Sequence, residues 1–170
     1  MDNEAGRRSG WADPPLSEIG VAQARQLRGL IADRRFDAVF VSDLQRAVQT
    51  AELAFPEVEI RLDPRLREMN YGWLNGALES AFDEDEARFI EYPLKQGECC
   101  RDVQRRIEEF LQECYAPDSE VAIISHRFPQ LALEVIFNSH SWHAAIERDW
   151  RHVGAWQLGW VYDAGRAMNA

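Results

Sequence analysis

Two short apolar runs, each followed at once by a helical pattern, constrain the fold of this 170-residue chain most strongly. The first run is AVFVS (residues 38–42) and the second is VAIIS (residues 121–125). Runs of this kind, rich in β-branched residues, are typical of strands buried on both faces of a parallel sheet. Because a strand that leads directly into a helix is the repeating unit of such a sheet, the sequence predicts an α/β fold.

The rest of the chain is predicted to alternate in the same way. Ser17 precedes an amphipathic pattern and is the expected N-cap of a helix, while Ser42 or Asp43 is the expected cap of the helix after the first run. No internal repeat or linker divides the sequence, so one domain over residues 1–170 is expected. The other predicted elements are strands over residues 58–62 and 156–162, helices near residues 81–92 and over 101–114, and loops over residues 1–20 and 65–80.

The charge of the chain limits its partners. The formal net charge is −10 and the isoelectric point is about 4.9, so nucleic acid or an anionic membrane surface would be repelled over most of the protein. No apolar stretch is long enough to span a bilayer, and no secretory N-terminus is present in the sequence. Any anion that the protein binds is therefore expected to be small and to be held by a local basic pocket.

The cysteines and histidines favour a reduced, cytoplasmic protein without a metal site. Cys99 and Cys100 are adjacent, which is a poor geometry for a disulfide, and Cys114 leaves the number of thiols odd. The spacing of these residues relative to the histidines matches no usual zinc pattern, so no metal is expected.

Three side chains carry the chemistry that the predicted fold brings to one edge of the sheet. Arg46 lies one turn into the first helix after a strand, and His126 stands where the second buried run ends. Helix N-termini at this edge offer amide donors to anions, an arginine can clamp phosphate oxygens, and a histidine can exchange a proton. Plainer interpretations stay open: an ion pair of Arg46 with Asp43, a histidine satisfied by the backbone, and a solvated loop carboxylate for Glu68.

Four segments of the chain, taken together, resemble the histidine phosphatase (phosphoglycerate mutase-like) superfamily. Each carries a short motif of that family, the motifs follow in the same order, and the resemblance runs from residue 3 to about residue 163. The segments are NEAGRRSGWADPPLSEIGVAQA (residues 3–24), SDLQRAVQTAE (42–52), LREMNYGWLNG (66–76) and ISHR (124–127).

The resemblance implies a fold and a site. The fold would be a three-layer α/β/α sandwich around a mostly parallel sheet. Arg46 would bind the phosphoryl group, His126 would stabilise it beside the nucleophile, and Glu68 would act as the general acid. Neither a metal nor another cofactor is required, because phosphoryl transfer asks mainly for positioned cations, donors and one proton donor. The residues expected to line the same pocket are Asn3, Ser9 and Gly10.

The family's nucleophile is a histidine in an Arg-His-Gly signature at the end of the first strand. Aligning Asn3 with the family places that signature before Met1, so the first strand and the nucleophile are predicted to be missing from the chain. The string that contains His152 echoes the signature but stands far downstream, without the strand-to-turn context. An internal start site, a truncated remnant and a relative that only binds phosphate all remain open as explanations.

These observations favour a phosphomonoester hydrolase that acts on a small intracellular phosphorylated substrate, inactive or severely impaired in this form. The short segment between Arg46 and the second histidine motif leaves little room for a mutase lid, which favours hydrolysis. The alternative is a catalytically inactive phosphate-binding or protein-interaction module of the same fold, and an α/β domain of unrelated function also remains open. The expected ligand is a small phosphorylated molecule or inorganic phosphate, and assembly into a homo-oligomer is left open.

Overall fold

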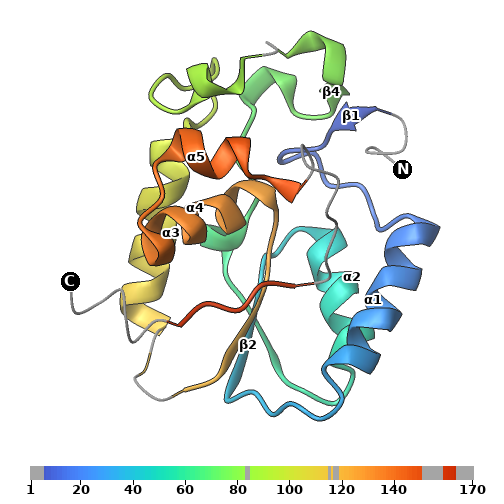
Figure 1. The fold of residues 1–170 in the computed structure, drawn as a ribbon. Coiled ribbons are helices and arrows are strands. Elements are labelled where there is room, and N and C mark those ends of the chain that lie inside the picture. The colour runs from blue at the N-terminus through green and yellow to red at the C-terminus, as the bar shows by residue number, and fades with distance from the viewer. Residues whose placement is uncertain (1–5, 83–84, 115, 117–118, 151–158, 164–170) are drawn as a thin grey trace.

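A three-stranded parallel sheet with helices on both sides forms the centre of the computed structural model (Figure 1). The strand order is β3-β2-β5, and a separate two-stranded antiparallel ladder joins β1 to β4. The structure describes residues 6–82, 85–114, 116, 119–150 and 159–163. The helices and strands are β1 (Arg7–Arg8), α1 (Glu18–Leu30), β2 (Ala38–Val41), α2 (Gln45–Ala54), β3 (Ile60–Leu62), β4 (Ala77–Leu78), α3 (Cys100–Cys114), β5 (Val121–Ile124), α4 (Arg127–Asn138) and α5 (Trp142–Glu147).

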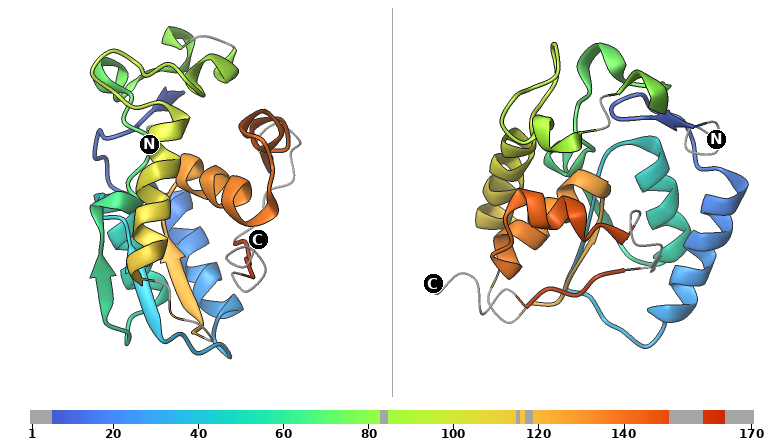
Figure 2. Two further views of the ribbon diagram at one scale, coloured as in Figure 1. Left: turned by 90° about the vertical axis from the view of Figure 1, so that its left-hand side faces the viewer. Right: turned by 45° about the horizontal axis from the view of Figure 1, so that its top comes forward.

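The central strand β2 shows why the fold has three layers. Successive side chains of a strand point to opposite faces, so Val39 and Val41 enter one core with Ala47 and Ala51 of α2. Phe40 enters the other core and meets Phe110 of α3 edge-to-face, with ring centroids 5.2 Å apart. Helices α1 and α2 lie on one side of the sheet, and α3 and α4 lie on the other (Figures 1 and 2). The predicted α/β/α sandwich with a mostly parallel sheet is confirmed.

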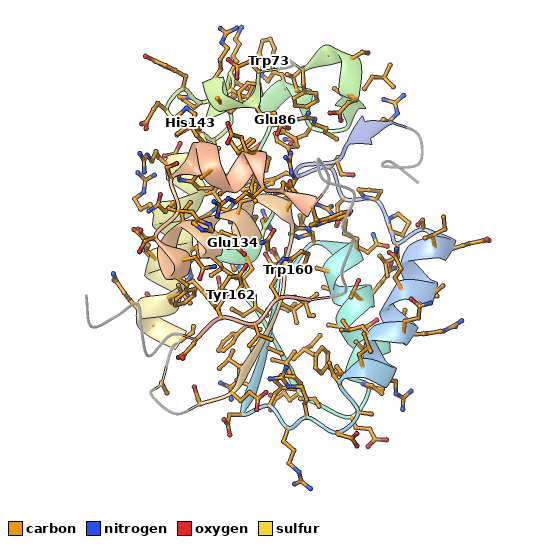
Figure 3. The ribbon with its side chains drawn as sticks, viewed as in Figure 1. Trp73, Glu86, Glu134, His143, Trp160 and Tyr162 are labelled. Carbon is orange, nitrogen blue, oxygen red and sulfur yellow. The ribbon has the colours of Figure 1, made fainter. Side chains whose placement is uncertain are left out.

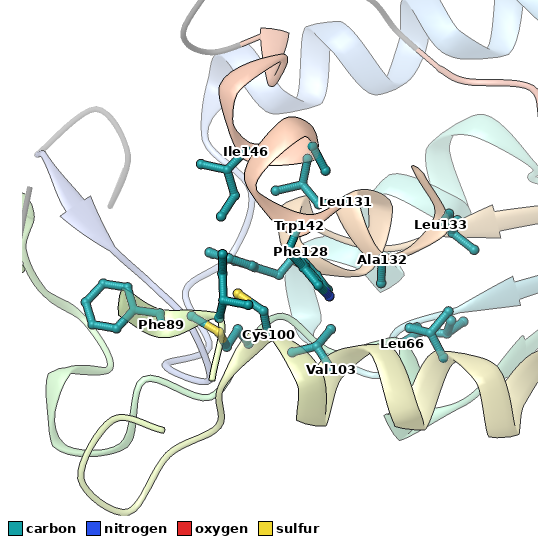
Figure 4. Packing of buried hydrophobic residues seen from close by; sticks show 14 of the residues in the cluster. Leu66, Phe89, Cys100, Val103, Phe128, Leu131, Ala132, Leu133, Trp142 and Ile146 are labelled. Carbon is teal, nitrogen blue, oxygen red and sulfur yellow. The ribbon is translucent and has the colours of Figure 1, made fainter. Parts of the chain in front are cut away.

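The larger core lies between α3 and α4. Val103, Phe128 and Leu131 are almost fully buried in it (Figure 4). Burying each such side chain contributes about 1.5–3 kcal/mol relative to leaving it in water. The helical period over residues 101–114 therefore reflects real burial, although α3 begins one residue earlier, at Cys100.

The predicted N-cap of α1 is confirmed, whereas that of α2 is wrong. Ser17 Oγ accepts a hydrogen bond of 3.1 Å from Gly20 N. Helix α2 begins after Leu44, which makes no side-chain cap bond. Asp43 is instead paired with an arginine and Ser42 Oγ meets a histidine ring, as described below, because these tertiary partners compete for the two side chains. A residue of the N-terminal loop binds the first N–H group of α2 instead: Asp13 Oδ1 accepts a hydrogen bond of 2.7 Å from Gln45 N.

The acidic helix expected near residues 81–92 is also wrong. The described part of this stretch holds only two short 3₁₀ turns, Glu79–Ala81 and Glu86–Phe89. Asp85 accepts a hydrogen bond from Ala87 N at 3.1 Å, a local turn that competes with helix formation. Like charges spaced along one helix face would also repel one another.

Other local predictions are corrected in detail. The strand expected over residues 58–62 begins at Ile60, and helix α5 was not predicted. Of the strand expected over residues 156–162, residues 156–158 lie outside the described residues, and residues 159–163 are not in a strand. Tyr162 packs on α4 instead, where its hydroxyl donates to Glu134 Oε1 at 2.7 Å (Figure 3). The loops expected at residues 1–20 and 65–80 contain the strands β1 and β4, which pair with each other.

Among the described residues, β5 is an edge strand. It pairs with β2 along its whole length and has no other strand neighbour in this part of the chain. The prediction that an interior strand is missing from the sheet is not tested by this pairing and stays a prediction.

Candidate functional site

A cavity of about 1370 Å³ opens at the carboxyl edge of the parallel sheet. Its lining includes Arg46 near the start of α2, Glu68 from the loop after β3, and His126 between β5 and α4. Ser9 and Gly10 from the N-terminal loop line the same cavity. The structure thus brings together five of the six residues predicted for the site, although their roles remain predictions. The sixth, Asn3, lies outside the described residues.

Arg46 is held at the cavity wall by the N-terminal loop. Its Nη1 donates to Ala12 O at 3.0 Å and its Nη2 donates to Gly10 O at 2.8 Å. Carbonyl oxygens carry no net charge, so these two bonds orient the guanidinium without neutralising it. The loop bends at Gly10, which has a φ of +52°, and a Cβ there would lie 2.2 Å from Asn75 Oδ1. Only glycine fits this position.

His126 stands at the N-cap of α4, where β5 ends. Its Nε2 lies 2.9 Å from Ser42 Oγ at the end of β2. Burial, together with the positive charges of Arg46 and Arg106, lowers the pKa of His126 well below its usual value. The ring is therefore neutral near neutral pH, and it meets a ligand through a nitrogen–hydrogen donor rather than through a full positive charge.

Glu68 is buried rather than solvated, and it caps α4 from outside the helix. Only 9% of the residue is exposed. Its Oε1 accepts hydrogen bonds from Met69 N at 2.8 Å and from Phe128 N at 3.0 Å. Its Oε2 accepts one bond, of 3.1 Å, from Arg127 N. Because the first N–H groups of a helix lack partners within it, these bonds tie the carboxylate to the element that carries His126.

Comparison with known proteins assigns the family. A family model described as the histidine phosphatase superfamily (branch 1) matches residues 1–150. The chain belongs to this superfamily. Phosphoserine phosphatase 1 of Hydrogenobacter thermophilus is 32% identical over 143 residues, which are 77% of this chain and 68% of that protein. Adenosylcobalamin/alpha-ribazole phosphatase of Salmonella typhimurium is 31% identical over 137 residues, covering 74% of this chain and 68% of that protein.

A solved structure agrees with this assignment. The crystal structure of phosphoglycerate mutase from Thermus thermophilus superposes with a TM-score of 0.67 at 34% sequence identity. The match covers 79% of this chain and 77% of the other. The resemblance inferred from the four motifs is thereby confirmed at the level of the family and the fold.

The loop that carries Glu68 is also held by Arg106 of α3. Arg106 Nη2 donates to Glu68 O at 3.0 Å, and its Nε donates to Glu98 Oε1 at 2.9 Å. Trp11 Nε1 donates to the same Glu68 carbonyl at 2.7 Å. Neither Arg106 nor Glu98 was predicted from the sequence. The one hint was an arginine directly before Ile107, on the apolar side of a helix.

A second group of ion pairs joins the segment around Glu86 to the first residue of α4, Arg127. Arg127 donates from Nη1 and Nη2 to the two carboxylate oxygens of Glu86, both at 2.8 Å. It also pairs with Asp149, and Arg8 Nη1 lies 2.8 Å from Glu86 Oε1. Burial alone would lower the pKa of Arg127, but the bonds and charges of Glu86 and Asp149 raise it above its usual value. Arg127, the residue after His126, is thus fixed through its side chain as well as its backbone.

Proposed function

We propose that this histidine phosphatase is a phosphomonoester hydrolase that acts on a small phosphorylated molecule. The observation that carries the proposal is that Arg46, Glu68 and His126, from three separate segments, line one cavity. A positioned cation, a neutral donor and a carboxyl group are the parts that phosphoryl transfer needs when no metal takes part.

In this proposal, Arg46 grips two phosphoryl oxygens with its guanidinium. Its bonds to the carbonyls of Ala12 and Gly10 come from Nη1 and Nη2 and fix the plane of the group. The guanidinium lines the cavity, so a ligand oxygen there can accept a hydrogen bond from it. His126 adds a further donor from the end of β5.

Glu68 is proposed as the general acid for the leaving oxygen. Its Oε1 already accepts two backbone bonds, whereas Oε2 accepts one bond from the described residues, that of Arg127 N. A protonated Oε2 still has a lone pair for that bond, so it is the oxygen that can carry the transferred proton without breaking the helix cap.

The nucleophile is proposed to be absent from residues 1–170. The chain has four histidines, and none of them stands in an Arg-His-Gly string. His126 already has another role in this proposal, His143 lines the cavity from a helix, α5, rather than from a strand end, and His152 lies outside the described residues. His140 interacts with Arg148 and Glu134. The absence of a nucleophilic histidine from residues 1–170 supports the second candidate function, a binding module of the same fold that holds phosphate without turnover.

One experiment tests the site and separates the two candidates. Thermal unfolding is followed while inorganic phosphate or vanadate is added, and hydrolysis of an aryl phosphate is assayed on the same samples. A ligand at about 100 times its Kd stabilises the folded state by about 2.7 kcal/mol. We expect this gain in the unaltered chain and its loss in Arg46→Ala, whereas Arg105→Ala, an exposed position on α3, serves as the matched control.

The two readouts have separate meanings. Because both candidates predict little hydrolysis by residues 1–170 alone, turnover is also assayed on a form lengthened at its N-terminus to carry the Arg-His-Gly signature. Stabilisation with hydrolysis by that form supports the hydrolase, and stabilisation of both forms without hydrolysis supports the binding module. Equal stabilisation of the Arg46→Ala variant, or none in any variant, refutes the site.

The cytoplasm is the proposed location, and the proposed ligand is inorganic phosphate or a small phosphorylated molecule. The three cysteines form no disulfide, which supports a reducing compartment. No helix in the described part of the chain is long and apolar enough to cross a bilayer. Assembly into a homo-oligomer stays a prediction.

A further inference from the structure

The hydroxyl of Ser42 meets the ring of His126 at the point where β2 and β5 end side by side. Ser42 is fully buried and does not line the cavity itself. Its backbone N–H donates to Ile124 O at 2.9 Å, which extends the pairing of the two strands by one residue. The same pairing sets Ser42 Oγ 2.9 Å from His126 Nε2.

Counting protons and lone pairs limits what this contact can be. A serine hydroxyl has one proton and two lone pairs. One lone pair accepts a bond of 3.3 Å from Leu44 N. Toward His126 the hydroxyl therefore either donates its proton to Nε2 or accepts a proton from Nε2. A neutral imidazole carries one N–H, so these two choices correspond to its two tautomers.

A phosphate in the cavity distinguishes the tautomers. Since Nε2 faces Ser42, Nδ1 is the ring nitrogen left for a ligand, and within the described residues Nδ1 has no hydrogen bond to protein. The oxygens of a dianionic phosphate can only accept hydrogen bonds. His126 can bind them through Nδ1 only if Nδ1 carries the proton, and then Ser42 must donate to Nε2.

We propose that Ser42 is a positioning residue that holds His126 in the Nδ1–H tautomer, so that the ring presents a donor to the phosphoryl group. Ser42 acts on the ligand through the ring and never touches it. This role rests on the proposed function, because it requires that the cavity binds phosphate. Among the described residues, Ser42 is the one hydrogen-bond partner of Nε2. Because Ser42 is fully buried, water does not readily replace its hydroxyl.

The tautomer can be observed directly. Nitrogen NMR of protein labelled in histidine separates a protonated ring nitrogen from a bare one, and it requires neither turnover nor ligand. We expect the unaltered chain to show the Nδ1–H form of His126. In Ser42→Ala we expect the Nε2–H form to gain population, and in Ser42→Thr, which restores a hydroxyl, the Nδ1–H form to return.

Phosphate binding gives the second readout. Losing one preorganised hydrogen bond weakens binding by roughly two- to tenfold, so the Kd of Ser42→Ala for inorganic phosphate should rise by that factor. Val41→Ala is the matched control, because Val41 is a fully buried neighbour on the same strand whose side chain packs in the core beside α2. It lowers stability without changing the tautomer or the Kd.

The outcomes separate the two claims. If the unaltered chain binds phosphate while Ser42→Ala keeps both the tautomer and the affinity, the role of Ser42 is refuted and the proposed function stands. An Nε2–H tautomer in the unaltered chain also overturns the role of Ser42. If the unaltered chain fails to bind phosphate at all, the proposed function is refuted, and the donor role with it.

Discussion

Replacing Arg127 by methionine should destabilise the protein far more than its position at a helix terminus suggests. The guanidinium is held by Glu86 through both carboxylate oxygens and by Asp149. The side chains of Arg127, Glu86 and Asp149 are only 12%, 9% and 0% exposed. Methionine keeps much of the volume but leaves two buried carboxylates without this partner.

The magnitude follows from that burial. Removing one member of a buried ion pair costs about 3–5 kcal/mol, because a charge is left uncompensated in a poor solvent. Glu86 retains its ion pair with Arg8 in this variant, so we expect a loss of stability in the lower half of this range. For a chain of this size, about 3–4 kcal/mol corresponds to a fall in Tm of roughly 10 °C.

The assay is urea unfolding followed by tryptophan fluorescence, with Arg105→Met as the control. Arg105 pairs with Asp102 on the exposed face of α3, and its side chain is 68% exposed. Removing such a pair costs about 0–1 kcal/mol. If Arg127→Met loses no more stability than Arg105→Met, the ion pairs of Arg127 with Glu86 and Asp149 contribute no more than a surface pair, and the prediction is refuted.

Three further predictions concern the backbone and pH. Gly10→Ala should cost about 1–3 kcal/mol in urea unfolding, because the positive φ of Gly10 and the nearby Asn75 side chain both exclude a Cβ. Hydrogen bonds from Arg67 lower the pKa of Asp43, so the stability lost in Asp43→Asn should be full above about pH 4 and vanish as the pH falls further. Burial lowers the pKa of His126 instead, so below about pH 6.5 the unfolded chain binds a proton more readily than the folded one. The free energy of unfolding should therefore fall there by up to about 1.4 kcal/mol per pH unit, and by less in His126→Gln.

The parts of the fold that the sequence predicted are those whose pattern comes from burial. Strands β2 and β5 are short apolar runs because helices cover both faces of the sheet, and α3 shows a clear period because one of its faces enters the core. The convergence of Arg46, Glu68 and His126 was predictable for a related reason. The carboxyl ends of parallel strands meet at one edge, so residues that follow those strands must come close together.

The contacts that position the site were not predictable, because a charged residue gives no sign of its partner. Arg127 and Glu86 are 41 residues apart in the sequence, and Arg106 and Glu68 are 38 apart. Tertiary partners that the sequence does not reveal also explain the wrong prediction for the N-cap of α2. Ser42 and Asp43 look like helix caps until His126 and Arg67 are seen to use them.

A net charge of −10 and a phosphate cavity are compatible because electrostatic range is short. Ions at physiological strength screen exposed charges beyond about 8 Å, so most surface carboxylates act weakly on a small ligand in the cavity. Two of the five described carboxylates that line the cavity are largely compensated, since Glu86 binds Arg8 and Arg127, and Glu68 accepts three backbone N–H groups. Arg46 lines the cavity, and the carbonyl oxygens that orient it there carry no net charge. A polyanion, by contrast, would extend over the acidic surface and be repelled along its whole length, so the same charge that excludes nucleic acid leaves the binding of a small phosphate intact.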